Sequence, residues 1–398
     1  MRAPNHFALV AGGLLTLAVV LFIALGSHGF VHFDAALTGY AIGTMLAAFA
    51  VGYRFMVWAQ RPPSRMYFKR GLQLFFRPVA PTSKSAVSRV SKPAGRSNSD
   101  ARSDGGRAAD LEVGDTAGLE TRATTEPPRT PLPFPHGAGT LGFALTRNFV
   151  AQEFIRRRGG YRWIMHLCLS GGCTLAFAIT FPLVFGWIHF ESFADNAEMY
   201  RVLMFGLPVD SFSVHSLKAL VMFNALNISA VLVLVGLVLA AYRRLTDAGE
   251  RATQTFLEDI LPLLMIFAVT ATGLALTVCY KFLEGRGHHL WAVVHMVSVV
   301  ALLLYIPYGK LFHMFQRTCS LCVSRYKKVG ATGPRAHCRS CGEDFASQMQ
   351  VDDLKVVLDQ LGFDYRFATA HGHIHYQDIC PACRRKLLAL NQGRSIGR

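Results

Sequence analysis

Residues 295–313 read HMVSVVALLLYIPYGKLFH, an apolar run with a histidine at each end and with Pro307 and Lys310 near its exit. The two histidines are 18 residues apart, which is five turns of α-helix, so both rings are predicted to lie on one helix face. At about 1.5 Å per residue they lie about 27 Å apart, close to the roughly 30 Å of a bilayer core. Ionisable groups at membrane depth are costly and usually functional, so the pair predicts two ligand levels across a membrane. The alternative is two interfacial histidines at the ends of a span.

The composition indicates a membrane protein. The chain has 398 residues, of which 52% are hydrophobic, and a formal charge of +16. Its apolar residues come in blocks of about twenty, which predicts transmembrane helices. We therefore interpret the positive charge as a topology signal and as attraction to anionic lipid headgroups. No motif interleaves aromatic with basic residues, so we expect no nucleic-acid partner.

Six apolar blocks predict an all-α membrane protein with six transmembrane helices. A signal peptide is the rival interpretation of the first block, but the block is long and a second one follows closely. Lys and Arg cluster at alternate ends of the blocks, so the positive-inside rule places both termini in the cytoplasm of a bacterial-type inner membrane. The predicted spans are residues 7–26, 35–58, 163–188, 215–242, 258–281 and 290–312, and residues 189–214 are predicted to be a loop.

The composition also divides the chain into four parts. Residues 1–60 form an N-terminal pair of spans, and residues 61–160 form a basic cytoplasmic linker. Its residues 79–140 are rich in Ser, Arg, Gly, Thr and Pro, so we expect the linker to be largely disordered, because this stretch has too little apolar surface to bury. Residues 161–316 carry the other four spans, and residues 317–398 form a small cytoplasmic, Cys-rich α+β domain.

The predicted topology places two histidines at one depth. The third span runs outward, so His166 lies near its cytoplasmic start, and the sixth runs inward, so His313 lies at the same level. Two imidazoles from different helices at one depth are the usual axial pair of a low-spin haem b. No CxxCH motif suggests covalent attachment. Ser170, Gly171 and Gly172 would make room for a porphyrin edge, or else mark close helix packing.

Spans three to six resemble the gamma (cytochrome b) subunit of respiratory nitrate reductase and the related membrane subunits of heterodisulfide-reductase-like complexes. The resemblance covers residues 162–316. It rests on RWIMHLCLSGG in the third span, YRRL ending the fourth, EDILPLL opening the fifth, and the H-x11-P-x5-H pattern of residues 295–313. It implies an electron-transfer subunit, which would pass electrons from a membrane quinol through haem to a cytoplasmic iron–sulfur or molybdenum-containing partner. Substrate chemistry would lie on other chains, so we expect no catalytic residue in this one.

The same resemblance assigns the haem ligands. It implies that His166 and His313 hold the haem nearer the cytoplasm and that His295 holds a distal haem. The family's second distal ligand lies ten residues after the counterpart of His166, where this chain has Ala176. Either the distal haem is absent, or His295 pairs with another residue. His215 is the best substitute because it opens an adjacent span on the same side.

Three CxxC pairs after the last span predict a metal site. The first two pairs are separated by 15 residues, as in a zinc ribbon. The last two instead suggest a knuckle followed by a turn at Gly342 and a pair at a helix start, as in treble-clef zinc sites. Zinc is favoured over iron or an iron–sulfur cluster, which stays open because the first pair follows His313 closely. The candidate ligands are Cys319, Cys322, Cys338, Cys341, Cys380 and Cys383.

Other features of the C-terminal part leave further alternatives. His371, His373 and His375 alternate as on one face of a strand, and they are either ligands or exposed. Residues 351–361 predict a short amphipathic helix. A non-redox membrane scaffold with a zinc-binding interaction domain would fit the spans and the metal domain, but not the histidine spacing. A transporter is disfavoured because the sequence has no internal repeat.

Overall fold

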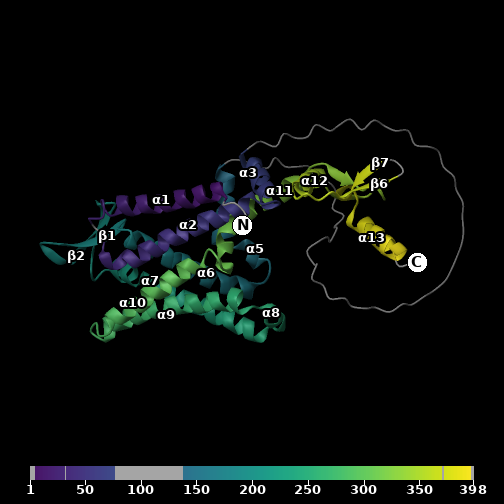
Figure 1. The fold of residues 1–398 in the computed structure, drawn as a ribbon. Coiled ribbons are helices and arrows are strands. Elements are labelled where there is room, and N and C mark those ends of the chain that lie inside the picture. Colours follow the sequence, from purple (N-terminus) through teal and green to yellow (C-terminus); the bar gives the residue numbers. More distant parts are fainter. Residues whose placement is uncertain (1–4, 32, 77–137, 370–371, 396–398) are drawn as a thin grey trace. The chain divides into compact units, whose positions relative to one another are not determined.

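The computed structural model describes residues 5–31, 33–76, 138–369 and 372–395 (Figure 1). The chain is mostly helical with three small antiparallel sheets, and six helices are long and apolar enough to cross a membrane. The fold class is thereby confirmed in its coarse form. The six helices are α1 (His6–Gly26), α2 (Thr38–Gln60), α6 (Gly160–Val184), α7 (Leu217–Thr246), α9 (Leu261–Phe282) and α10 (His288–Tyr305), with a turn at Phe256–Ile260 that leads into α9.

The other elements surround this bundle or form the C-terminal part. The remaining helices are α3 (Ser64–Phe76), α4 (Ala138–Leu145), α5 (Glu153–Arg156), α8 (Ala248–Thr253), α11 (His313–Thr332), α12 (Gln348–Gln360) and α13 (Pro381–Ser395). The strands are β1 (Ile188–Phe193), β2 (Asn196–Met204), β3 (Leu207–Ser213), β4 (Arg335–His337), β5 (Asp344–Ser347), β6 (Arg366–Thr369) and β7 (Gly372–His375).

Small residues set where the first two spans touch each other and the rest of the bundle. A Cβ atom on Gly12 would lie 2.8 Å from the carbonyl oxygen of Phe49, and one on Gly52 would lie 3.0 Å from that of Ala11. On α2, a Cβ on Gly43 would lie 3.2 Å from a valine side chain of α10. Close approach at small residues is a main source of helix association in lipid. The N-terminal pair is therefore joined to the other four spans through α2.

The sixth apolar run is not one helix. The helix α10 ends at Tyr305, because Pro307 offers no amide hydrogen and Gly309 is extended (φ −87°, ψ −172°), and α11 begins at His313. A side chain at Gly309 would overlap the ring of Tyr305, which keeps this position small. The prediction that His295 and His313 share one helix face is therefore wrong.

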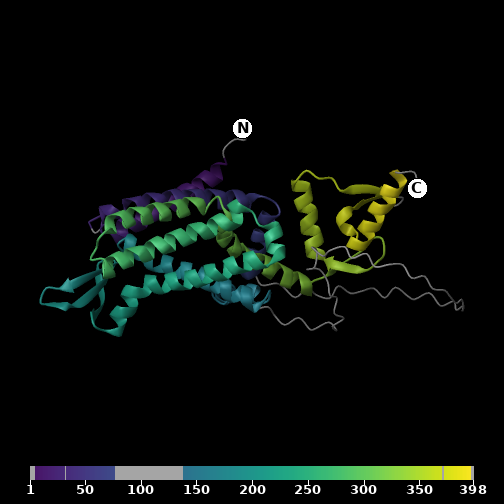
Figure 2. The same ribbon diagram turned by 90° about the horizontal axis from the view of Figure 1, so that it is seen from below.

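A three-stranded antiparallel sheet, in the order β1-β2-β3, links α6 to α7 and lies beyond the ends of the long apolar helices (Figure 1, Figure 2). The prediction of a loop at 189–214 is wrong, because Val202 and Phe212 bury against Ala219 of α7 and give the strands an apolar face. The third span also ends earlier than predicted. Its chain turns at Gly186, whose φ of +72° suits glycine.

The predicted linker is helical at both of its described ends, and residues 77–137 lie outside the described part. The helix α3 packs on α11 so closely that a side-chain carbon on Gly71 would overlap Cys322. This part is ordered because α3 is amphipathic, with Gly71 and Phe75 on its buried side. The described flanks of the predicted linker thus contain the helices α3, α4 and α5, and the part whose composition predicts disorder lies almost entirely outside the described residues.

The C-terminal part combines two hairpins with two helices. The β4–β5 hairpin leads into α12, the β6–β7 hairpin follows, and α13 ends the described chain (Figure 2). The predicted amphipathic helix is confirmed as α12, which buries Val351 and Val357. Its Asp353 is 7% exposed and accepts hydrogen bonds from Tyr326 Oη (2.8 Å) and Arg70 Nη2 (3.0 Å).

Candidate metal centre and membrane histidines

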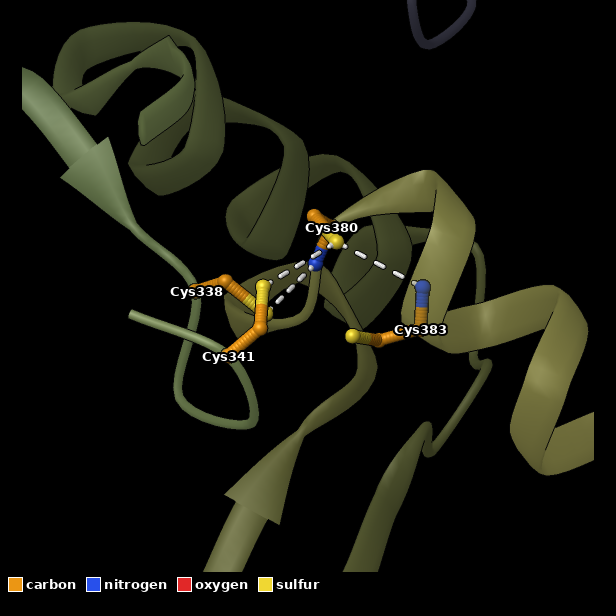
Figure 3. A group of neighbouring side chains, drawn as sticks. All are labelled: Cys338, Cys341, Cys380 and Cys383. Atoms are coloured by element: carbon orange, nitrogen blue, oxygen red, sulfur yellow. Dashed lines mark hydrogen bonds between the residues drawn. The ribbon is translucent and has the colours of Figure 1, made fainter. Parts of the chain in front are cut away.

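Four cysteines meet between the first hairpin and the last helix of the C-terminal part (Figure 3). Cys338 and Cys341 flank the tight turn after β4, and Gly342 completes this turn with φ +77°. Cys380 and Cys383 lie at the start of α13. All four sulfur atoms lie within 4.8 Å of one another, so they can bind one metal ion. This group combines the last two CxxC motifs, which is the treble-clef alternative predicted from the sequence.

The spacing and hydrogen bonds of these sulfurs fit a tetrahedral metal. Cys341 Sγ lies 3.8 Å from Cys380 Sγ. A tetrahedron with Zn–S bonds of about 2.3 Å has edges of about 3.8 Å. Burial disfavours the Cys338 thiolate, but the backbone N–H groups of Cys380, Cys341 and Ser340 point at its sulfur and lower its pKa to about 6. Cys338 thus favours the thiolate, the form in which cysteine binds metals.

The remaining predicted ligands of the Cys domain lie outside this group. Cys319 and Cys322 are buried in α11, and burial raises the pKa of the Cys322 thiol to about 11. They pack as small apolar groups, so the structure does not support the zinc-ribbon pairing of the first two motifs. His373 and His375 lie on β7 as predicted, and His375 Nδ1 accepts a hydrogen bond from the Gln377 backbone; His371 lies outside the described residues.

His166 is held by a chain of hydrogen bonds. Ser170 Oγ donates its one proton to the His166 carbonyl oxygen (2.7 Å), so this hydroxyl accepts from Gln152 Nε2 (2.6 Å). The amide oxygen of Gln152 then faces His166 Nδ1 at 2.8 Å, so Nδ1 donates its hydrogen to it. The other ring nitrogen, Nε2, therefore keeps its lone pair.

His313 is held in the same tautomer by the main chain. Its Nδ1 lies 2.6 Å from the carbonyl oxygen of Lys310, which can only accept a hydrogen bond. The Lys310 ammonium in turn lies 2.5 Å from the buried carboxylate of Asp259, which also pairs with Arg244 at 3.5 Å. This ion pair ties the break after α10 to the ends of α7 and α9.

His166 and His313 lie at the same end of the bundle. Their imidazoles are close enough to interact electrostatically, and Arg317 acts on both. Among the described residues, no hydrogen bond reaches Nε2 of either ring. The two histidines therefore lie near the start of α6 and at the start of α11, each with an Nε2 atom that the hydrogen bonds of the described residues leave free. Gly172, in contrast, packs against α7 and makes no room for a cofactor, while a Cβ on Gly171 would meet open space.

His295 lies in another place, at the edge of a cavity of about 450 Å³ between α2, α6, α7, α9 and α10. Its Nδ1 lies 2.9 Å from Thr272 Oγ1. Ala176 lines the same cavity, so the two positions that the resemblance links to a distal haem do meet here. His215 is exposed just before α7 and is not part of the lining, so the structure does not bring it to His295.

The chain matches no protein-family model, no curated protein and no solved structure.

Sequence reasoning missed Gln152 and Thr272, the hydrogen-bond partners of two candidate histidines. Gln152 precedes the third span by eight residues and carries no motif of its own. Only the structure sets Gln152 apart: the residue is 7% exposed and adopts a left-handed backbone conformation (φ +48°). Such a conformation is uncommon for a residue other than glycine, and it often marks a functional constraint.

Proposed function

We propose that the chain is a membrane cytochrome b subunit of an oxidoreductase complex, with His166 and His313 as the residues that would hold a haem b. The observation that carries this proposal is the pair of neighbouring imidazoles, each of which presents Nε2 while its Nδ1 is hydrogen-bonded. Metal-binding histidines usually donate their second N–H to a carbonyl or an amide oxygen, which fixes the tautomer and raises the basicity of the ligand. Gln152 and the Lys310 carbonyl serve that role here.

The residues around the pair support the same assignment. The buried ion pair of Lys310 with Asp259 holds the turn that aims His313. Arg317 lies near both imidazoles and would offer a cation to an acidic porphyrin side chain. A bound haem b supplies a one-electron carrier, and the protein would tune its potential through these ligands.

The partners follow from this role. A membrane quinol would be the electron donor, and an iron–sulfur or molybdenum-containing subunit would receive the electrons on the cytoplasmic side. The clusters of Lys and Arg support this orientation, since the positive-inside rule favours both termini on the cytoplasmic side of an inner membrane. The first two spans and the C-terminal domain lie outside the resemblance to nitrate reductase gamma subunits, so the partner need not reduce nitrate.

The metal at the four cysteines is, in this proposal, a structural zinc ion. Four thiolates without an open position are typical of structural zinc sites. The cysteines fix the turn after β4 to the start of α13 and so replace a larger core in a small domain. Iron in the same tetrahedral site would be coloured and redox-active, so metal analysis and a visible spectrum of the purified chain separate the two ions.

The test is the dithionite-reduced minus oxidised visible spectrum of the full chain, purified in detergent from haem-supplied cells. We expect a b-type band that is lost in His166→Ala and in His313→Ala. The exposed His215→Ala is the matched control and should keep the band, since it lies outside both candidate sites. A folded wild-type chain without haem would overturn the proposal.

A second function is favoured by a separate observation, the four-cysteine group. A non-redox membrane scaffold that presents a zinc-bearing interaction domain needs this group and the spans but no haem. One zinc ion per chain together with no haem in the spectrum would select this alternative.

A further inference from the structure

An open pocket of about 450 Å³ lies where α6 begins and α7 ends. Its walls come from the loop before α6 and from the last residues of α7. Gly159 adopts φ +135°, which suits glycine, and a Cβ atom on Gly159 or on Gly160 would meet no other atom within 4 Å. The side of the pocket that the two glycines form is therefore open to a ligand.

Three arginines line this pocket, and two of them have no acidic partner. Arg243 pairs with Glu250, and its Nε atom lies 3.9 Å from a carboxylate oxygen of Asp247. Asp247 is the only carboxylate among the lining residues, and it already accepts hydrogen bonds from backbone N–H groups of α8. Arg158 and Arg162 are exposed and form no hydrogen bond or ion pair within the described part of the chain. The pocket therefore presents two guanidinium groups that are available to an anion.

These two groups fit a phosphate. A guanidinium group is planar and always protonated, and its N–H groups can donate in pairs to two phosphate oxygens. Basic pockets between membrane helices on the cytoplasmic side are typical sites for phosphate-bearing lipid headgroups. In the orientation favoured by the positive-inside rule, the start of α6 and the end of α7 lie on that side. The pocket would then lie at the level of the headgroups.

An exposed apolar face of α7 leads away from the pocket. Val231, Val235, Val238 and Tyr242 follow one another at intervals of four, three and four residues, so they share one side of the helix, and all four are exposed. Tyr242 also lines the pocket. Tyrosine is enriched at the membrane interface, where its ring lies in apolar and its hydroxyl in polar surroundings. The pocket and this face together fit a ligand with an anionic head and long apolar chains.

We infer that the pocket binds the phosphate of an anionic phospholipid, with Arg158 and Arg162 as donors to its oxygens and with an acyl chain along the exposed face of α7. The lipid connects the start of α6 to the end of α7. The inference goes beyond the proposed function: it rests on the membrane placement of the long apolar helices and is independent of the haem. It assigns one site to an attraction that the net charge alone would spread over the surface.

The experiment measures lipid binding to the full chain, purified in detergent, by native mass spectrometry with dioleoyl phosphatidylglycerol as the probe. We expect Arg158→Gln and Arg162→Gln each to weaken the first binding step about tenfold or more, because each loses charge-assisted hydrogen bonds. Arg157→Gln is the matched control and should bind as the wild type does. It removes the same charge one position away, but Arg157 pairs with Glu153 at 2.9 Å and lies outside the pocket. Thermal unfolding in detergent checks that each variant is folded.

Two further probes identify the class of ligand. Dioleoyl phosphatidylcholine has the same chains and a phosphate, but its choline group neutralises the head, so it should bind about tenfold more weakly. Glycerol 3-phosphate has the anionic head without the chains. It should bind about a hundredfold more weakly than phosphatidylglycerol, because it leaves the apolar face of α7 uncovered.

Each result decides the inference. Binding of phosphatidylglycerol that Arg158→Gln and Arg162→Gln leave unchanged would place the lipid elsewhere and overturn it. An equal loss in Arg157→Gln would reveal a diffuse charge effect without a site, which also overturns it. Equal binding of phosphatidylcholine would refute the anionic class, and glycerol 3-phosphate that binds as tightly as the lipid would make the ligand a soluble phosphate. The haem spectrum tests the proposed function separately, since no arm of this experiment depends on haem.

Discussion

The amide oxygen of Gln152 lies 2.8 Å from His166 Nδ1, and Gln152 reaches it from a left-handed backbone conformation with φ +48°. That conformation costs about 1–3 kcal/mol for a residue other than glycine, so surrounding contacts must enforce it. Ser170 holds the other end of the amide through a hydrogen bond of 2.6 Å. These contacts fix the orientation of the His166 imidazole, as the proposed ligand role requires.

The first prediction concerns Gln152. Gln152→Leu should lower the haem affinity of the full chain about 10–100-fold, because loss of a hydrogen-bond partner of a metal ligand commonly has this effect. Gln152→Glu keeps an acceptor and should keep the haem, but with a lower midpoint potential, since the carboxylate makes the imidazole more electron-rich. Haem titration of the apoprotein and potentiometry measure both effects. A purely structural glutamine would instead leave the potential of Gln152→Glu at the wild-type value.

Most helices of the bundle were predictable from the sequence, because an apolar block of about twenty residues indicates a helix long enough to cross a membrane. The break between α10 and α11 was not predicted, although Pro307 and Gly309 mark it, because a proline near the end of a span can also be accommodated as a kink. The β1–β3 sheet was missed because its alternation is short and its burial depends on Ala219 of another helix. Local pattern cannot show such long-range contacts.

The residues of the candidate sites were also predictable only in part. Histidines and cysteines can be recognised by residue type and spacing, so His166 and His313 were predicted to lie at one level. The last two CxxC motifs were one of two alternative pairings for the metal site. Only the three-dimensional structure excludes Cys322 from the metal site, because this residue is buried under Gly71. Only the structure, too, shows that Gln152 contacts His166. Residues that hydrogen-bond to a candidate ligand are ordinary polar residues, and nothing in their sequence context distinguishes them from other polar residues.

The second prediction concerns the cysteines. Cys380→Ser should remove the metal from the purified chain, because one thiolate of four is lost, and should lower the midpoint temperature of the C-terminal domain. Cys322→Ser is the matched control: it also replaces a buried cysteine of a CxxC motif, but lies outside the four-sulfur group. Metal content by mass spectrometry should fall from one ion per chain to near zero only in Cys380→Ser. An equal loss of metal in Cys322→Ser would contradict the assignment.

The third prediction concerns the crossing of α1 and α2. Gly12→Ala places a Cβ within 2.8 Å of the Phe49 carbonyl oxygen, so it should destabilise the protein by about 1–3 kcal/mol, as overpacking does. Gly13→Ala is the neighbouring control, since a Cβ there meets no atom within 4 Å. It should be neutral or stabilising, because alanine favours helix over glycine by about 1 kcal/mol. Thermal unfolding in detergent compares the two, and equal effects would argue against a close crossing at Gly12.

The fourth prediction concerns the pH dependence of the contact between α11 and α12. Tyr326 is 1% exposed and donates a hydrogen bond to Asp353 Oδ2 at 2.8 Å. Burial, and then the Asp353 carboxylate, raise the pKa of Tyr326 far above the ordinary value of about 10. Because the folded-state pKa is the higher one, the stabilisation is complete below about pH 10 and is lost as the pH rises from there toward the folded-state pKa.

Tyr326→Phe tests this contact directly. It leaves the buried Asp353 short of one donor and should cost about 1–3 kcal/mol at neutral pH. It should also remove the tyrosine contribution to the loss of stability above pH 10, which denaturant unfolding at several pH values measures. Tyr365→Phe changes an exposed tyrosine of the same domain and should do neither. A wild-type alkaline transition that persists unchanged in Tyr326→Phe would show that another group controls it, because the phenylalanine variant has no hydroxyl at this position to ionise.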